Sequence, residues 1–201
     1  MMLTFKNLPF LFKQYAVVLF IAVLSILAFV FDNLISENLI YHRQAIFSGE
    51  YWRLITGHLF HTNGFHLLLN LSALFLLWLI HGHFYNLRNY PALLLFTALG
   101  TSIALLLFSI DISQYVGLSG VLHGVFVWGA MMDIHNKEKT GYLLFIGVWL
   151  KIAHEQIYGA SEDVTSLINA NVAIDAHLWG ALFGMLFAFF SLYFFNSKKT
   201  T

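Results

Sequence analysis

The stretch VAIDAHLWGALFGMLFAFFSLYFF, residues 172–195, decides the fold of this chain. A helix that spans a bilayer needs roughly 20 mostly apolar residues, and this run exceeds that length. Its acidic residue Asp175 and its histidine His177 both lie near its beginning. The stretch therefore predicts a membrane-spanning helix that carries a histidine close to one face of the bilayer.

The composition of the whole chain agrees with a membrane protein. Of the 201 residues, 59% are hydrophobic and only 10% are charged, and the mean hydropathy is +0.75. A soluble domain usually carries about a quarter charged residues, because its surface faces water. The absence of cysteine excludes disulfides and thiolate chemistry, and the zero net charge gives no indication of a nucleic-acid partner. We therefore expect the apolar surface of the folded chain to contact the lipid bilayer.

Six stretches approach the length of a span, which predicts an all-α polytopic membrane protein with a bundle of six transmembrane helices. They lie at approximately 15–31, 66–80, 91–110, 118–132, 142–157 and 172–195. The first follows Lys6 and Lys13, as in a signal peptide, but no small-residue cleavage site comes after it. We therefore expect a retained first helix, and a single domain over residues 1–201.

The lysines and arginines predict the orientation, because positive charges collect in cytoplasmic loops. One side of the predicted bundle would hold Lys6, Lys13, Arg88, Lys137, Lys139, Lys198 and Lys199, and the other only Arg43 and Arg53. Both termini are therefore expected in the cytoplasm. The loop between the first two spans contains Trp52 and Arg53. It either has a structure of its own or anchors at the headgroup interface, and the sequence leaves both open.

Gly117-Leu118-Ser119-Gly120, at the beginning of the fourth expected span, is the first candidate for chemistry. Glycines on both sides of a serine let the backbone bend and leave the Ser119 hydroxyl and N–H unshielded. Taken alone, the motif favours a packing role, because glycine and serine are common where membrane helices meet.

His177 is the second candidate, since an ionisable side chain inside a span is costly and indicates a functional role. Glycines four apart lie on one face of its helix and on one face of the Ser119 helix: Gly180 and Gly184, and Gly120 and Gly124. Such tracks let two membrane helices approach closely. The approach would bring His177 to the Ser119 hydroxyl, where it can act as a general base.

His66 and Asn70, at the start of the second expected span, share one helix face because they are four residues apart. Fixed hydrogen-bond donors near a serine nucleophile are what an oxyanion hole requires, and the alternative is a polar pair that bonds between helices. With the N-terminus inside, spans two, four and six all enter from the outer side. Their polar residues would then lie at a similar depth in the membrane, which favours a catalytic role over a role in helix packing.

In combination, these motifs resemble those of the rhomboid family over residues from about 50 to 190. The matching motifs are Trp52-Arg53, His66-x-x-x-Asn70, Gly117-Leu118-Ser119-Gly120, and Ala176-His177 with Gly180 and Gly184. The resemblance implies a six-helix intramembrane serine protease with a Ser–His dyad and no aspartate. It implies Ser119 as the nucleophile and His177 as the base. The Ser119 backbone N–H, His66 and Asn70 would form the oxyanion hole, supported by Gly117 and Gly120.

His123 departs from the common rhomboid pattern, which often has a tyrosine at this position. The sequence GLSGVLHG, residues 117–124, is similar to the rhombosortase branch of the family. This resemblance implies a bacterial inner-membrane protein whose substrate is a transmembrane protein with a C-terminal Gly-Gly, a hydrophobic span and a basic tail. We expect His123 to stack against His177. Because it follows Ser119 by four residues, it is also an alternative base.

Lys151 and Glu155, four apart in the fifth expected span, are expected to neutralise each other, with a role in reading the substrate as the alternative. His58, His61 and His66 match no standard zinc spacing, so neither a metal ion nor another cofactor is expected.

Two competing functions are a transporter and a non-catalytic rhomboid-like binding protein. The sequence has no inverted repeat of the kind that transporters often carry, and it keeps both Ser119 and His177. It does not decide whether an acyl group on Ser119 would pass to water or, in a transpeptidase, to another amine.

Overall fold

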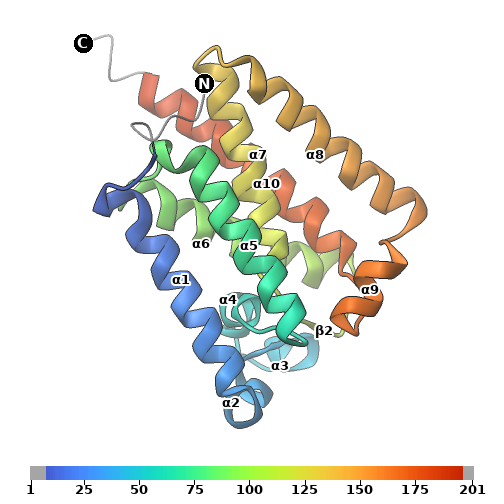
Figure 1. Cartoon of the computed structure of the whole chain (residues 1–201). Helices are drawn as coiled ribbons and strands as arrows, with labels where there is room; N and C mark the ends of the chain where they lie inside the picture. The colour runs from blue at the N-terminus through green and yellow to red at the C-terminus, as the bar shows by residue number, and fades with distance from the viewer. Residues whose placement is uncertain (1–7, 197–201) are drawn as a thin grey trace.

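The computed structural model describes residues 8–196, which form a helical bundle (Figure 1). The long helices in this part of the chain are α1 (Phe12–Val30), α5 (Gly64–His81), α6 (Asn89–Phe108), α7 (Ser119–His135), α8 (Lys139–Tyr158) and α10 (Ile174–Asn196). Each covers one of the six stretches expected from the sequence, with its ends shifted by a few residues.

The shorter elements lie in the connections. Between α1 and α5 are α2 (Asp32–Leu39), β1 (Tyr41–His42), α3 (Arg43–Phe47), α4 (Arg53–Thr56) and the 3₁₀ helix η2 (Gly57–Leu59). The others are η3 (Gly82–Phe84), β2 (Gln114–Tyr115) and α9 (Glu162–Ile168). β1 and β2 pair antiparallel, with Tyr41 opposite Tyr115. The all-α prediction is correct for every long element but missed this small sheet, because two-residue strands carry no periodic pattern.

Four helices in the described part of the chain are long and apolar enough to cross a membrane: Phe12–Val30, Gly64–Phe84, Asn89–Phe108 and Ile174–Tyr193. α7 has only 17 residues, and the apolar sequence of the continuous helix α8 is broken by the charged residues Lys151 and Glu155. The helices expected at these two positions are present, but six membrane crossings stay a prediction.

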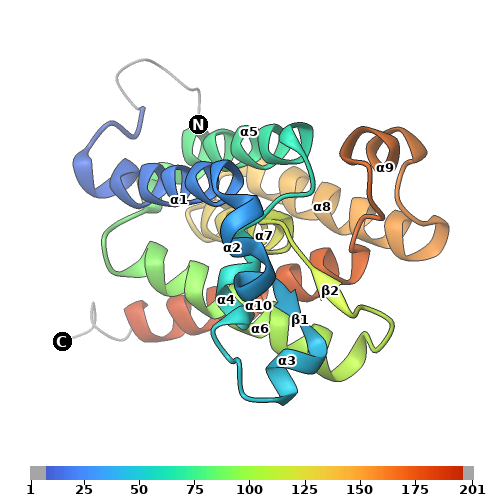
Figure 2. The same ribbon diagram turned by 90° about the horizontal axis from the view of Figure 1, so that it is seen from below.

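α7 lies at the centre of the bundle, where it packs against α10, α8, α6 and α5. Figure 2 shows α7 between α5 and α10. A Cβ atom added to Gly180 would collide with the carbonyl oxygen of Gly120, and one added to Gly184 with that of Gly124. The backbones of α7 and α10 are thus in direct contact, as the glycine pattern predicts.

The loop between α1 and α5 has a structure of its own, which was one of the two alternatives. Arg53, only 5% exposed, donates to the carbonyl oxygens of Glu37 and Ile40 at 2.9 Å each. Its Nε donates to the Glu50 carboxylate at 2.7 Å. A buried guanidinium needs such acceptors, so Arg53 holds the loop together from inside.

The start of α1 and the end of α10 lie at the same end of the bundle (Figure 1). An even number of crossings would place them so. Lys6, Lys198 and Lys199, which entered the orientation prediction, lie outside the described residues. The cytoplasmic location of both termini therefore stays a prediction.

Candidate active site

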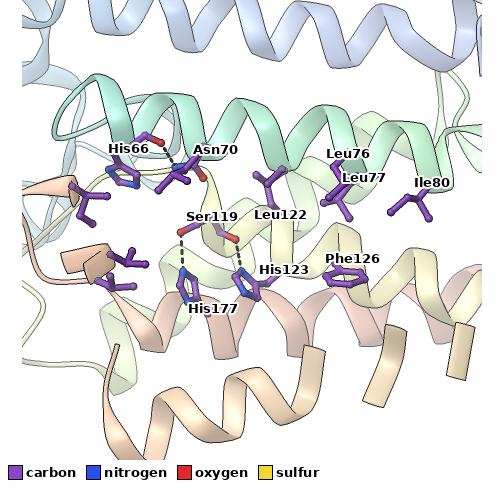
Figure 3. Close-up of a pocket in the computed structure, with 15 residues that line it drawn as sticks. His66, Asn70, Leu76, Leu77, Ile80, Ser119, Leu122, His123, Phe126 and His177 are labelled. Carbon is purple, nitrogen blue, oxygen red and sulfur yellow. Dashed lines mark hydrogen bonds between the residues drawn. The ribbon is translucent and has the colours of Figure 1, made fainter. Parts of the chain in front are cut away.

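Ser119 is the first residue of α7 and His177 lies in the first turn of α10, and their side chains face each other (Figure 3). The distance from Ser119 Oγ to His177 Nε2 is 3.0 Å. The contact between Gly120 and Gly180 produces this approach, because neither glycine has a side chain to hold the helices apart. A hydroxyl at this distance can give its proton to an imidazole, which is what a serine nucleophile requires of a base.

The turn before Ser119 leaves the backbone N–H of that residue available. The first N–H groups of a helix have no intrahelical acceptor, and the helix dipole favours negative charge beside them. Gly117 has a φ of +122°, in a region where glycine is favoured over other residues. The Tyr115 hydroxyl donates to the carbonyl oxygen of Gly117 at 2.6 Å and holds the turn.

His66 packs against this turn from α5. A Cβ atom on Gly117 would lie 2.9 Å from both Cε1 and Nε2 of His66, so the ring fills the space of a side chain. Asn63 caps α5 by accepting the N–H of His66 at 2.9 Å. The N–H of Thr62 donates to Nδ1 of His66 at 3.3 Å, so the proton of the neutral ring lies on Nε2. His66 thus presents a donor on the Gly117 side.

Asn70 lies one turn beyond His66 and is 4% exposed. Its Nδ2 donates to the carbonyl oxygen of His66 at 3.0 Å. A primary amide has two N–H groups, so the second remains for a ligand. His66, Asn70 and Ser119 line one cavity, as their spacing and expected depth predict (Figure 3).

Two cavities meet at Ser119. One, of about 280 Å³, runs from His66 to Ile80 between apolar side chains of α5 and α7 (Figure 3). The other, of about 320 Å³, lies among the loops and includes polar residues such as Thr62, Gln114 and Asn171. His66 and Ser119 line both, so the hydroxyl sits where an apolar cavity changes into a polar one.

His123 stacks on His177, as expected, with ring centroids 4.1 Å apart and planes 20° from parallel. Its Nδ1 lies 2.8 Å from the backbone oxygen of Ser119, and its Nε2 lies 2.8 Å from Lys151 Nζ. Both ring nitrogens are therefore engaged away from the Ser119 hydroxyl. This geometry favours His177 over His123 as the base.

Lys151 and Glu155 reach the same cluster from α8. Lys151 Nζ lies 2.8 Å from Glu155 Oε2, so the pair expected from their spacing is present. Glu155 Oε2 also lies 2.9 Å from His177 Nδ1, and Lys151 Nζ lies 3.1 Å from the same nitrogen. These contacts with His177 were not expected from the sequence. The spacing of four indicated a pair within one helix but not the helix that the pair faces.

Comparisons with known proteins identify the family of the chain. The family model described as "Rhomboid domain" matches residues 48–194. The chain belongs to the rhomboid family. It is also similar to the protein named "Putative rhomboid protease YdcA" of Bacillus subtilis (strain 168), with 28% identity over 197 residues that cover 92% of each chain. Rhomboids are multi-pass intramembrane proteases, which cleave transmembrane substrates within the membrane.

One group of metal-type ligands occurs among the described residues of this rhomboid: His123, Glu155 and His177, whose ligand atoms lie within 4.8 Å of one another. Lys151 Nζ lies 2.8 to 3.1 Å from an atom of each of these three side chains. A protonated amine repels a cation, so the three residues do not fit a metal ion as they stand.

His58 and His61 lie outside the Ser119 cluster. His58 Nε2 lies 3.0 Å from the carbonyl oxygen of Ala98, and burial lowers the pKa of this imidazole to about 4. His61 packs edge-on against His66, with centroids 5.0 Å apart, and burial lowers the pKa of the His61 ring to about 3. Both rings are therefore neutral parts of the loop structure near pH 7.

Proposed function

We propose that this rhomboid is a serine endopeptidase in which Ser119 is the nucleophile and His177 the general base. The observation that carries the proposal is the 3.0 Å distance between Ser119 Oγ and His177 Nε2. His177 accepts the Ser119 proton while Oγ attacks the carbonyl carbon of the scissile peptide bond. The protonated histidine then gives the proton to the leaving amine, and the acyl group remains on Ser119.

The oxyanion hole in this proposal consists of the Ser119 backbone N–H, His66 and Asn70. Negative charge develops on the carbonyl oxygen during attack, and donors already fixed in place stabilise it best. Three observations support these donors: the N-terminal position of Ser119 in α7, the Thr62 N–H that donates to Nδ1 of His66 and so leaves Nε2 as the donor, and the Asn70 amide that uses Nδ2 for one bond to the His66 carbonyl oxygen.

The acyl-enzyme then passes its acyl group to an acceptor. Water attacks with His177 again as the base, which releases the acid product and regenerates the Ser119 hydroxyl. Attack by another amine on the same intermediate would give transpeptidation. Hydrolysis and transpeptidation would therefore use the same catalytic residues.

We further propose that the substrate is a transmembrane protein with a C-terminal Gly-Gly, a hydrophobic span and a basic tail. A peptide bond inside a regular helix is shielded, and glycine weakens a helix more than any residue except proline. The apolar cavity along α5 and α7 suits apolar side chains of the span, and the loop-side cavity suits an extended segment. The resemblance to rhombosortases, which His123 carries, also supports this class of substrate.

Orientation and location follow from the charges. With both termini of the enzyme in the cytoplasm, the basic tail of the substrate would be cytoplasmic by the same rule. Ser119 would then meet the Gly-Gly pair at the outer boundary of the span. The expected location is the inner membrane of a bacterium.

Co-expression with a reporter that carries such a tail tests the proposal. The wild type should shorten the reporter, and Ser119→Ala, His177→Ala and the double variant should all fall to the same residual level, because parts of one unit give non-additive losses. Equal processing by wild type and Ser119→Ala would refute Ser119 as the nucleophile, and a reporter that the wild type leaves intact would favour the non-catalytic alternative. A reporter with Leu-Leu in place of Gly-Gly should resist cleavage; equal cleavage would refute the Gly-Gly preference alone.

A further inference from the structure

Glu155 lies beside the nitrogen of His177 that faces away from Ser119. The side chains of His177 and Glu155 are 7% and 12% exposed, and Glu155 Oε2 lies 2.9 Å from His177 Nδ1. A carboxylate can only accept a hydrogen bond, so this contact puts a proton on Nδ1. The lone pair of the neutral ring is then on Nε2, 3.0 Å from the Ser119 hydroxyl. This is the tautomer in which His177 can accept the Ser119 proton.

Lys151 offers the competing arrangement. Its Nζ lies 3.1 Å from the same Nδ1, and an ammonium group can only donate. A bond from Lys151 to Nδ1 would leave the ring proton on Nε2, and His177 could then not accept the proton of Ser119. Two closer acceptors compete for this ammonium at 2.8 Å each, namely Glu155 Oε2 and His123 Nε2.

His123 determines where Lys151 donates. Its Nδ1 lies 2.8 Å from the backbone oxygen of Ser119, and a carbonyl oxygen can only accept. The proton of the neutral His123 ring is therefore on Nδ1, and the lone pair on Nε2 faces Lys151. One assignment then satisfies the network: His123 donates to Ser119 O, Lys151 donates to His123 and Glu155, and His177 donates to Glu155.

We propose that Glu155 is the positioning residue that holds His177 in its base-competent tautomer, and that Lys151, anchored by His123, neutralises the Glu155 carboxylate. The inference rests on the proposed roles of Ser119 and His177. A carboxylate beside Nδ1 also stabilises the imidazolium that forms when His177 accepts the proton. The rhomboid resemblance implies a Ser–His dyad without an aspartate. In this chain Glu155 on α8 occupies the place of such an acid beside His177.

An isolated ion pair on α8 would not account for these contacts. Such a pair needs only the 2.8 Å distance between Lys151 and Glu155 within their own helix. It does not require the carboxylate to reach His177 on α10 or the ammonium to reach His123 on α7. A charged pair in the expected fifth span would also be costly, which argues for a function.

Steady-state cleavage of a transmembrane reporter in proteoliposomes tests the role. Glu155→Gln should lower kcat by roughly 10²-fold or more while KM changes little, and Glu155→Asp should recover part of the loss, because it keeps the carboxylate. The matched control is Gln156→Ala, an exposed neighbour on α8 that should stay near wild-type activity. Nitrogen-15 NMR of His177 gives a second readout: Nδ1 should carry the proton in the wild type, and Nε2 in Glu155→Ala.

The outcomes separate this inference from the proposed function. If Ser119→Ala abolishes cleavage while Glu155→Gln keeps the wild-type kcat, the role of Glu155 is refuted and the protease assignment stands. If Glu155→Gln is inactive but Glu155→Asp recovers nothing and the His177 proton stays on Nδ1 in Glu155→Ala, the loss is structural and the inference is again refuted. Cleavage that survives in Ser119→Ala would instead refute the proposed function.

Discussion

Gly124→Ala should separate α7 from α10 and thereby slow catalysis without touching a reacting atom. A Cβ atom at this position would lie 2.6 Å from the carbonyl oxygen of Gly180 and 2.6 Å from Thr97 Cγ2. Ordinary contacts of this kind begin at 3.4 Å, so the neighbours would have to move by about 0.8 Å. Thr97 on α6 is fully buried and has little freedom to yield, so α7 has to move away from Thr97 and α10 has to move away from α7.

This movement sets the expected magnitude. His177 lies one turn before Gly180 on α10, so a shift of about 0.8 Å along the Ser119–His177 contact would lengthen this 3.0 Å distance to at most about 3.8 Å. That is beyond hydrogen-bond range, and misplacements near 1 Å can cost about 10²-fold in rate. Overpacking should also lower the free energy of unfolding by about 1–3 kcal/mol.

The assay is kcat per folded molecule on the transmembrane reporter, together with the thermal unfolding midpoint. Gly147→Ala on α8 is the matched control, because no atom lies within 4 Å of its added Cβ and alanine favours helix more than glycine does. The control should keep wild-type activity and lose no stability. Wild-type kcat and midpoint in Gly124→Ala would refute the idea that this helix contact sets the Ser119–His177 distance.

Three further predictions follow from other parts of the molecule. Asn70→Ala should lower turnover by roughly 10²-fold or more with substrate binding largely intact, as for other oxyanion donors, and an effect on KM alone would make Asn70 a structural residue. Reporter fusions at residues 86, 137 and 201 should all read cytoplasmic, and an external C-terminus would put His177 at the wrong leaflet. Burial lowers the pKa of His58 in the folded protein to about 4, below the unfolded value of about 6.5. The contribution of neutral His58 to the free energy of unfolding is therefore fully present above pH 6.5 and is lost as the pH falls toward 4. His58→Gln should therefore flatten the dependence of unfolding free energy on pH in this window by roughly 3 kcal/mol, and an unchanged pH profile would contradict the assignment.

The helices and their close contact were predictable because the signals are local. Each long helix corresponds to an apolar run of the sequence, and length alone separates such runs from loops. The approach of α7 to α10 follows from glycines at spacing four, because the absence of a side chain is a property of the residue itself. The same spacing placed His66 and Asn70 on one face, and they line one cavity with Ser119.

The contacts that were missed join segments that are distant in the sequence. Lys151 and Glu155 were expected to pair, but the rotation of α8 about its axis decides whether the pair reaches His177, and packing against other helices sets that rotation. The pairing of Tyr41 with Tyr115 and the carbonyl partners of Arg53 are likewise set by the tertiary fold. No local periodicity reports such contacts.

Labelling by a serine-directed fluorophosphonate probe tests the central claim most directly, because the probe reacts only with an activated serine. We expect a single labelled site at Ser119 in the folded wild type, no labelling of Ser119→Ala, and strongly slowed labelling of His177→Ala. Labelling that persists in Ser119→Ala would contradict the assignment of the nucleophile. Normal labelling of His177→Ala, with loss of labelling in His123→Ala, would contradict the assignment of the base.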